Sequence, residues 1–400
     1  QITSGSSVWM YDAKWSDNSK YLLFFDRSLK LKYLDVESGN VKVVDTANRN
    51  EIKEYNFSPD SEWITYSKES KNSQSAIWVY NLKNGKNFQL TNDTFSDSEP
   101  VFSKDGNFIF FLSNRNFNLD FSSFEFDYLY NKATRIYAIS LKEDGPKLFA
   151  LKNDVEEVKV EDKEKGKKKE TDSQLKVLID LKNISNRISV FPLSSGNYGD
   201  LNAVDGGIVY STNRELHRYD IAKEKDEVIL NRVSDYTLSG NGKKTIYRAG
   251  STYGIIDVSA GKKVGDGELA LDGLEMKIDP KKEWMQIYTD GWRIFRDYYY
   301  VANMQGVDWA QIKANYNQLI PYVSHRADLD YILGEIISET NTGHAYVNYG
   351  DFEKVKPLET GLLGAKIKAD PKAGKYIISK IFEGENWTPN RRSPLTEQAV

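Results

Sequence analysis

Short apolar runs that alternate with polar residues recur over the first two-thirds of the chain, and a tight-turn sequence separates the runs of each pair. The same phrase appears at 13–25, 56–67 and 101–111, with a degenerate copy at 237–247. Its turns are rich in Ser, Pro, Asp, Asn and Gly, which adopt turn conformations at low cost. Because a period of two is typical of strands, each copy predicts a strand, a turn and a second strand.

A second phrase follows each of the first ones. Examples lie at 31–39, 76–86, 135–145 and 216–221 and predict a third strand, a turn and a fourth strand. Ser16, Ser58 and Ser103 of the first phrase are 42 and 45 residues apart, and Ser239 lies 136 residues beyond Ser103, or three such periods. Four strands in about 40–45 residues are typical of a β-propeller blade, since stacked blades bury each other's faces.

This repeat predicts five or six blades over residues 1–265. Closed propellers often have about six or seven, so a closed ring would need further blades before Gln1. The alternative is an open sandwich with turns that are similar by chance. One segment departs from the repeat: 159–170 has ten charged residues in twelve, six of them lysines. Such a run predicts a solvated loop at 154–173 inside a blade, with a binding segment as the alternative.

After Asp279 the apolar period changes to between three and four residues, which predicts helices. One stripe runs from Trp284 to Tyr299, a second from Trp309 to Leu319, and a third from Leu329 to Ile337. Pro321 stops the second helix, and residues 340–343 end the third. Residues 344–349 have the composition of a strand.

The composition excludes several classes of binding partner and catalytic site. A length of 400 residues predicts two or three domains, and a net charge of −4 gives no reason to expect nucleic acid as a partner. The absence of cysteine excludes disulfides, thiolate zinc sites and a cysteine nucleophile. Three dispersed histidines predict no metal site, and no cofactor motif is present. No apolar run approaches the roughly 18 residues of a membrane span.

Several of these stretches together resemble tricorn-type serine peptidases. The resemblance rests on 179–198 in the propeller, on 283–299, 308–309 and 341–346 in the helical part, and on 361–365, 376–381, 384–387 and 392–395 near the end. It implies a multidomain, mainly β fold: a β-propeller of four-stranded blades at 1–265, a mixed α/β core-1 domain at 266–350, and the start of a PDZ-like domain at 351–400, inside which the chain stops.

By this resemblance His344 is the catalytic general base, since the family carries its histidine in a turn just after a helix. Gly343, where the family archetype has a serine, is expected to let the backbone turn sharply and aim the ring at a cleft. The family's nucleophilic serine, oxyanion glycine and glutamate follow the PDZ domain, so this chain contains no residue for those roles. For a lone histidine the alternative is a structural role, which we expect for His217 and His325.

The resemblance implies a serine endopeptidase that acts on peptides or unfolded chains, and it predicts that this 400-residue piece is inactive alone. The propeller would admit extended substrate, and the PDZ-like module would bind a chain end by strand addition. A homo-oligomer and a cytoplasmic location are expected, a periplasmic or exported form being the alternative. The competing hypothesis is a non-enzymatic scaffold that binds peptides, glycans or cell-envelope partners.

Overall fold

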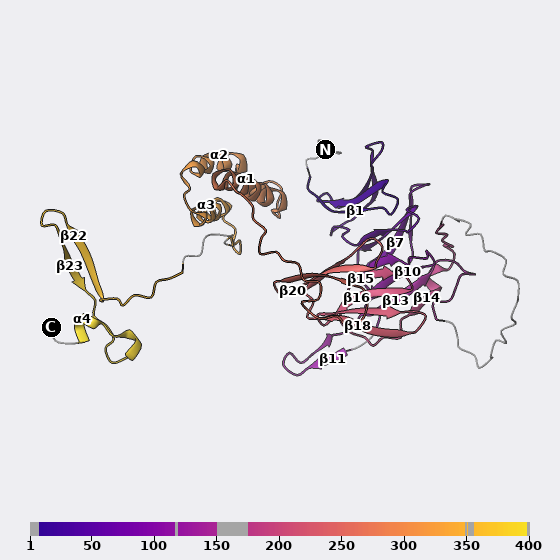
Figure 1. The fold of residues 1–400 in the computed structure, drawn as a ribbon. Helices are drawn as coiled ribbons and strands as arrows, with labels where there is room; N and C mark the ends of the chain where they lie inside the picture. Colours follow the sequence, from indigo (N-terminus) through magenta and orange to yellow (C-terminus); the bar gives the residue numbers. More distant parts are fainter. Residues whose placement is uncertain (1–7, 117–118, 150–174, 349, 351–355, 398–400) are drawn as a thin grey trace. The chain divides into compact units, whose positions relative to one another are not determined.

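A computed structural model describes residues 8–116, 119–149, 175–348, 350 and 356–397. The chain forms two compact units, Gln1–Gly273 and Leu274–Val400. We describe each unit by itself (Figure 1).

The first unit begins with two four-stranded antiparallel sheets, each formed in chain order. Blade 1 comprises β1 (Met10–Trp15), β2 (Tyr21–Asp26), β3 (Lys30–Asp35) and β4 (Val41–Thr46). Blade 2 comprises β5 (Tyr55–Phe57), β6 (Trp63–Glu69), β7 (Ser75–Asn81) and β8 (Lys86–Gln89). The turns between first and second strands are built as the sequence predicts, since Ser58 Oγ accepts from the Trp63 N–H at 2.9 Å and closes the turn.

Three further sheets follow. Blade 3 pairs β9 (Asp97–Phe102), β10 (Phe108–Ser113), β13 (Arg135–Ser140) and β14 (Ile188–Val190), and it carries the hairpin of β11 (Leu119–Ser122) and β12 (Asp127–Tyr130). Blade 4 comprises β15 (Tyr198–Val204), β16 (Gly207–Thr212), β17 (Glu215–Asp220) and β18 (Lys225–Asn231). Blade 5 comprises β19 (Asp235–Leu238), β20 (Lys244–Ala249) and β21 (Thr252–Asp257), with a single bridge from Gly254 to Glu268 at the fourth position.

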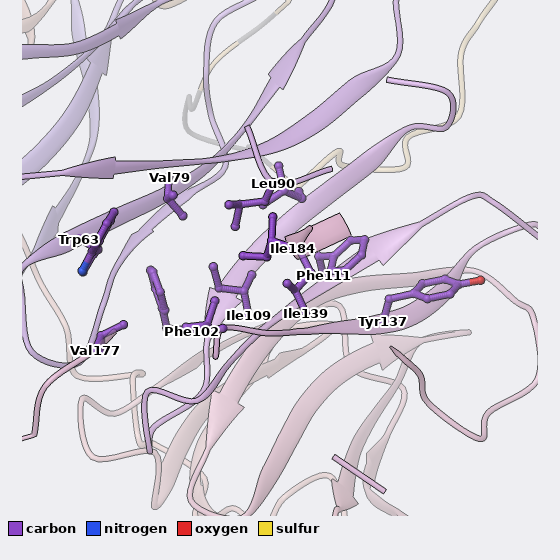
Figure 2. Close-up of a cluster of buried hydrophobic side chains, with 12 residues drawn as sticks. Trp63, Val79, Leu90, Phe102, Ile109, Phe111, Tyr137, Ile139, Val177 and Ile184 are labelled. Carbon is purple, nitrogen blue, oxygen red and sulfur yellow. The ribbon is translucent and has the colours of Figure 1, made fainter. Parts of the chain in front are cut away.

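The hydrophobic core lies between neighbouring blades, as the repeat predicts. Four clusters join successive blades from the first to the fifth. In the cluster between blades 2 and 3, Ile77, Ile109 and Ile139 are fully buried, and Val177 and Ile184 from the segment before β14 complete it (Figure 2). The prediction of a propeller of four-stranded blades is therefore confirmed, with five blades in the described residues.

Two details of the repeat were predicted wrongly. The interval from Ser103 to Ser239 holds two blade steps rather than three, because blade 3 contains the β11–β12 hairpin and the long segment between β13 and β14. The fourth strand of blade 3 does not follow β13 directly, as the phrase at 135–145 predicts, but lies at Ile188–Val190. The segment just after β13 is unsuited to the fourth strand, because Pro146 has no N–H to donate and Leu148 is buried in the core toward blade 4. Ile188 and Val190 are β-branched residues, which suit a strand. The charged segment at 159–170 lies outside the described residues.

The second unit begins with helices. They are α1 (Pro280–Tyr298), α2 (Trp309–Asn317) and α3 (Arg326–Ser338), with short 3-10 turns η2 (Met304–Gly306) and η3 (Ile320–Tyr322) between them. Asp279 and Asp308 cap α1 and α2 by accepting from backbone N–H groups, at 3.4 and 2.9 Å. Trp292 and Trp309 stack at 6.4 Å and each donates its indole N–H to the other's carbonyl, which fastens α1 to α2.

The rest of this unit is a two-stranded sheet with short helical turns. Strand β22 (Ala365–Asp370) pairs antiparallel with β23 (Lys375–Ile381), and η4 (Pro389–Arg391) and α4 (Pro394–Glu397) come after it. All seven residues of β23 are exposed. Among the described residues, no helix is long and apolar enough to cross a membrane.

Candidate functional site

Helix α3 leads directly into the turn that carries His344. At the start of α3, the His325 ring accepts from the Ala327 N–H at 3.1 Å, and Asp328 accepts from the His325 N–H at 3.0 Å, which together form a capping box. At its end, the Thr340 hydroxyl donates to the Ile337 carbonyl at 2.8 Å. Thr340 is buried, so the chain leaves the helix at a defined point.

His344 lies on an exposed turn two residues beyond Thr342. Its backbone is left-handed, with φ of 58°, and Asn341 shares this conformation with φ of 50°. The imidazole Nδ1 lies 3.4 Å from the Tyr346 hydroxyl. The predicted strand at 344–349 does not form over 344–348, because no partner strand pairs with this segment in the described residues. The ring is therefore held by the turn rather than by a sheet.

Gly343 lies between the two left-handed residues of this turn. The left-handed conformations fall on Asn341 and His344, and Gly343 is not among the positive-φ glycines. A Cβ built on Gly343 would meet no atom within 4 Å. The position has room for the serine of the family archetype, and the supporting role of Gly343 stays a prediction.

The two other histidines have structural contacts. His325 caps α3 through its ring. His217 in β17 is buried, stacks on Tyr210 at 5.3 Å, and contacts Asp226 at 2.9 Å and Glu215 at 3.3 Å. Burial opposes the charged ring, but the two carboxylates outweigh it and raise the pKa of His217. Both therefore match the structural role expected from the sequence.

The first strands of the five blades surround shared cavities in the propeller. Residues of β1, β5, β9 and β15 and of the turn after β19 line a cavity of about 320 Å³, which includes Lys14 and Lys104. A second cavity of about 300 Å³ is lined by the same strands and by Tyr236, and includes Glu54, Glu99 and Asp200. Since Lys14 and Asn202 line both, the two cavities follow one path between the blades.

A carboxylate connects neighbouring blades along this path. Glu54 accepts from the backbone N–H of Glu99 at 2.8 Å, and Glu99 accepts from the N–H of Leu201 at 2.7 Å. Burial, with the charges of Glu54 and Asp200, raises the pKa of Glu99 to about 7. These contacts were not foreseen, although an acidic residue precedes the turn serine by four positions in four blades: Asp12, Glu54, Glu99 and Asp235.

The described part of the chain holds no group of three or more histidine, cysteine or acidic side chains suited to a metal ion. The structure therefore offers two features for function: an exposed histidine on a helical domain, and a polar path between propeller blades. The fold that carries them is a β-propeller of four-stranded blades followed by a helical region.

The comparisons with known proteins identify the family. The second β-propeller domain of tricorn protease matches residues 1–259, its C1 domain matches 280–338, and its PDZ domain matches 361–400. The chain belongs to the tricorn protease family.

Individual relatives support the same assignment. Tricorn protease homolog 1 of Streptomyces coelicolor is 26% identical over 91% of this chain, and the tricorn protease homolog of Saccharolobus solfataricus is 23% identical over 97%. A crystal structure of the tricorn protease shares the fold with a TM-score of 0.71 at 19% identity, covering 98% of this chain and 38% of that one. The chain spans 36% of the length of each of these two homologs.

Proposed function

We propose that this chain is part of a serine endopeptidase of peptides or unfolded polypeptides, in which His344 is the general base. The observation that carries the proposal is the placement of His344. Its ring is exposed on the turn after α3, and its hydrogen-bonding contact in the described residues is the Tyr346 hydroxyl. The other two imidazoles are occupied by a helix cap and by carboxylates.

The proposed chemistry needs a nucleophile and oxyanion donors besides the base. A serine hydroxyl would lose its proton to the imidazole, and backbone N–H groups would stabilise the oxyanion. The resemblance assigns these groups to a domain that comes after the PDZ domain in the family. The 400-residue chain alone is therefore expected to be inactive.

In this proposal the propeller admits the extended substrate, and the PDZ-like segment binds a chain end. The polar path between blades has backbone and carboxylate groups that suit an extended peptide. The edges of the β22–β23 hairpin, which pair with no other strand of the described residues, suit strand addition. Assembly into a homo-oligomer belongs to the same proposal.

The test is His344→Ala in the longer polypeptide of which this chain would be a part. Loss of one general base is expected to lower kcat/KM on fluorogenic peptides by at least about a hundredfold. The control is His325→Asn, which keeps a side-chain acceptor at the α3 cap and should retain activity. If His344→Ala keeps the kcat/KM and the unfolding temperature of the unsubstituted protein, His344 is not the general base. Peptide binding without any turnover in the unsubstituted longer protein would favour the scaffold.

A further inference from the structure

We infer that the Tyr299 hydroxyl is a positioning group for His344: it fastens the end of α1 to the turn that presents the imidazole. This inference rests on the proposed function of His344. Tyr299 caps the end of α1, and the turn begins 41 residues later in the chain. The bond between them therefore ties two distant segments at the proposed base.

The connection is a short, direct hydrogen bond. The Tyr299 hydroxyl and the Thr342 hydroxyl are 2.5 Å apart, and Thr342 is two residues before His344. Gln305 donates its side-chain N–H to the Tyr299 oxygen at 3.1 Å. The same amide also contacts the Tyr300 hydroxyl.

Either hydroxyl of this pair can be the donor. The Thr342 hydroxyl also lies 3.3 Å from the carbonyl of Thr340. These contacts form one connected network, from Gln305 through Tyr299 and Thr342 to the backbone of the buried Thr340.

Beyond the bonds that end α3, the bond to Tyr299 holds a turn whose backbone is unfavourable. Asn341 and His344 are both left-handed, a conformation that costs a residue other than glycine of order 1 kcal/mol or more. Residues 345–348 form no strand. Tyr299, in contrast, is held from three sides: its N–H bonds the Phe295 carbonyl at 2.9 Å, and its ring contacts those of Phe295 at 5.3 Å and Tyr300 at 4.8 Å.

A neighbouring tyrosine supplies a matched control. Tyr300 is 72% exposed, and its hydroxyl contacts Gln305 rather than the turn. Tyr299→Phe and Tyr300→Phe each remove one hydroxyl from adjacent residues and leave the rings in place. Only the first change breaks the bond to Thr342.

The first measurement is on this chain and is independent of catalysis. The sequence has three histidines, so their imidazole NMR resonances can be assigned by substitution. Tyr299→Phe should shift or broaden the resonances of His344 and leave those of His217 and His325 unchanged, while Tyr300→Phe should leave all three unchanged. Unaltered His344 resonances in Tyr299→Phe would overturn the inference.

The second measurement uses the longer polypeptide. Tyr299→Phe should lower kcat by about ten- to a hundredfold with little change in KM, because misplacing a catalytic group by about 1 Å has an effect of this size. Thr342→Val should lower kcat by a similar factor, and Thr342→Ser, which keeps the hydroxyl, should have the kcat of the unsubstituted protein.

The outcomes separate this inference from the proposed function. If His344→Ala abolishes turnover while Tyr299→Phe and Thr342→Val leave kcat unchanged, the inference fails and the proposed function stands. If His344→Ala retains turnover, the proposed function fails, and the NMR result alone decides whether Tyr299 positions the ring.

Discussion

Strand β10 of the propeller and strand β23 of the second unit are both largely apolar but have opposite surroundings. Their sequences are FIFFLS and KYIISKI. All six residues of β10 are buried between neighbouring blades, whereas all seven of β23 are exposed in a two-stranded hairpin. An apolar strand thus becomes core only when other sheets cover it, since an isolated hairpin is at best marginally stable.

The two regions also differ in how backbone groups are held. In the propeller, side chains of one blade bond the backbone of the next, as Glu54 and Glu99 do. Among the helices of the second unit, hydroxyl groups of Tyr299, Thr340 and Thr342 bond at the turn that carries His344. The difference predicts that the propeller loses stability when buried core side chains or the bonds between blades are removed. The turn that carries His344 is expected to be sensitive at a few hydroxyl groups.

The largest effect is expected from removing core volume in the propeller. Ile109 in β10 is fully buried, and Ile109→Ala should lower the free energy of unfolding of the propeller by about 2–5 kcal/mol. The control, Ile378→Ala in β23, truncates a side chain that is 53% exposed and should change stability by less than about 0.5 kcal/mol. Chemical denaturation followed by fluorescence measures both. Equal losses would contradict the contrast between the two strands.

A smaller effect is expected at the carboxylate between blades 3 and 4. Glu99→Ala leaves the buried N–H of Leu201 without its acceptor and should cost about 1–3 kcal/mol. Glu99→Gln keeps an acceptor oxygen and should cost less, which makes it the matched control.

The same residue predicts a pH dependence of stability. Folding raises the pKa of Glu99 from 4.5 to about 7, so the folded chain binds this proton more tightly than the unfolded chain. Stability should therefore fall as the pH rises from 4.5 to about 7. His217, with its raised pKa, acts in the same direction above its ordinary value of 6.5. Glu99→Gln should flatten the lower part of the profile, and a profile identical to that of the unsubstituted chain would contradict the assignment.

The smallest effect is expected at the turn itself. Gly343→Ser adds a side chain where a Cβ meets no atom within 4 Å, so stability should change by less than about 0.5 kcal/mol. Gly207→Ala in β16 is the contrasting variant, because its Cβ would lie 2.1 Å from the Tyr219 carbonyl oxygen. That overlap should cost about 1–3 kcal/mol. Thermal unfolding compares the two, and a large loss in Gly343→Ser would show that the turn is more crowded than the structure indicates.

Local patterns along the chain were sufficient for most of the fold. The blades were predicted from the turns that contain serine and from the runs with a period of two. The three helices were predicted from apolar stripes before and after Pro321. Both kinds of element depend on residues that are close in sequence. The position of His344 after α3 came from a resemblance, and its role stays a prediction.

Contacts between distant segments were decided only by the tertiary structure. The fourth strand of blade 3 lies at Ile188–Val190, because pairing with β13 depends on which segment reaches the open edge of the sheet rather than on which segment is next in the chain. The links from Glu99 to Leu201 and from Tyr299 to Thr342 join residues 102 and 43 positions apart. No local pattern specifies such a pair, because a hydrogen bond between distant residues exists only after the surrounding core has fixed both ends.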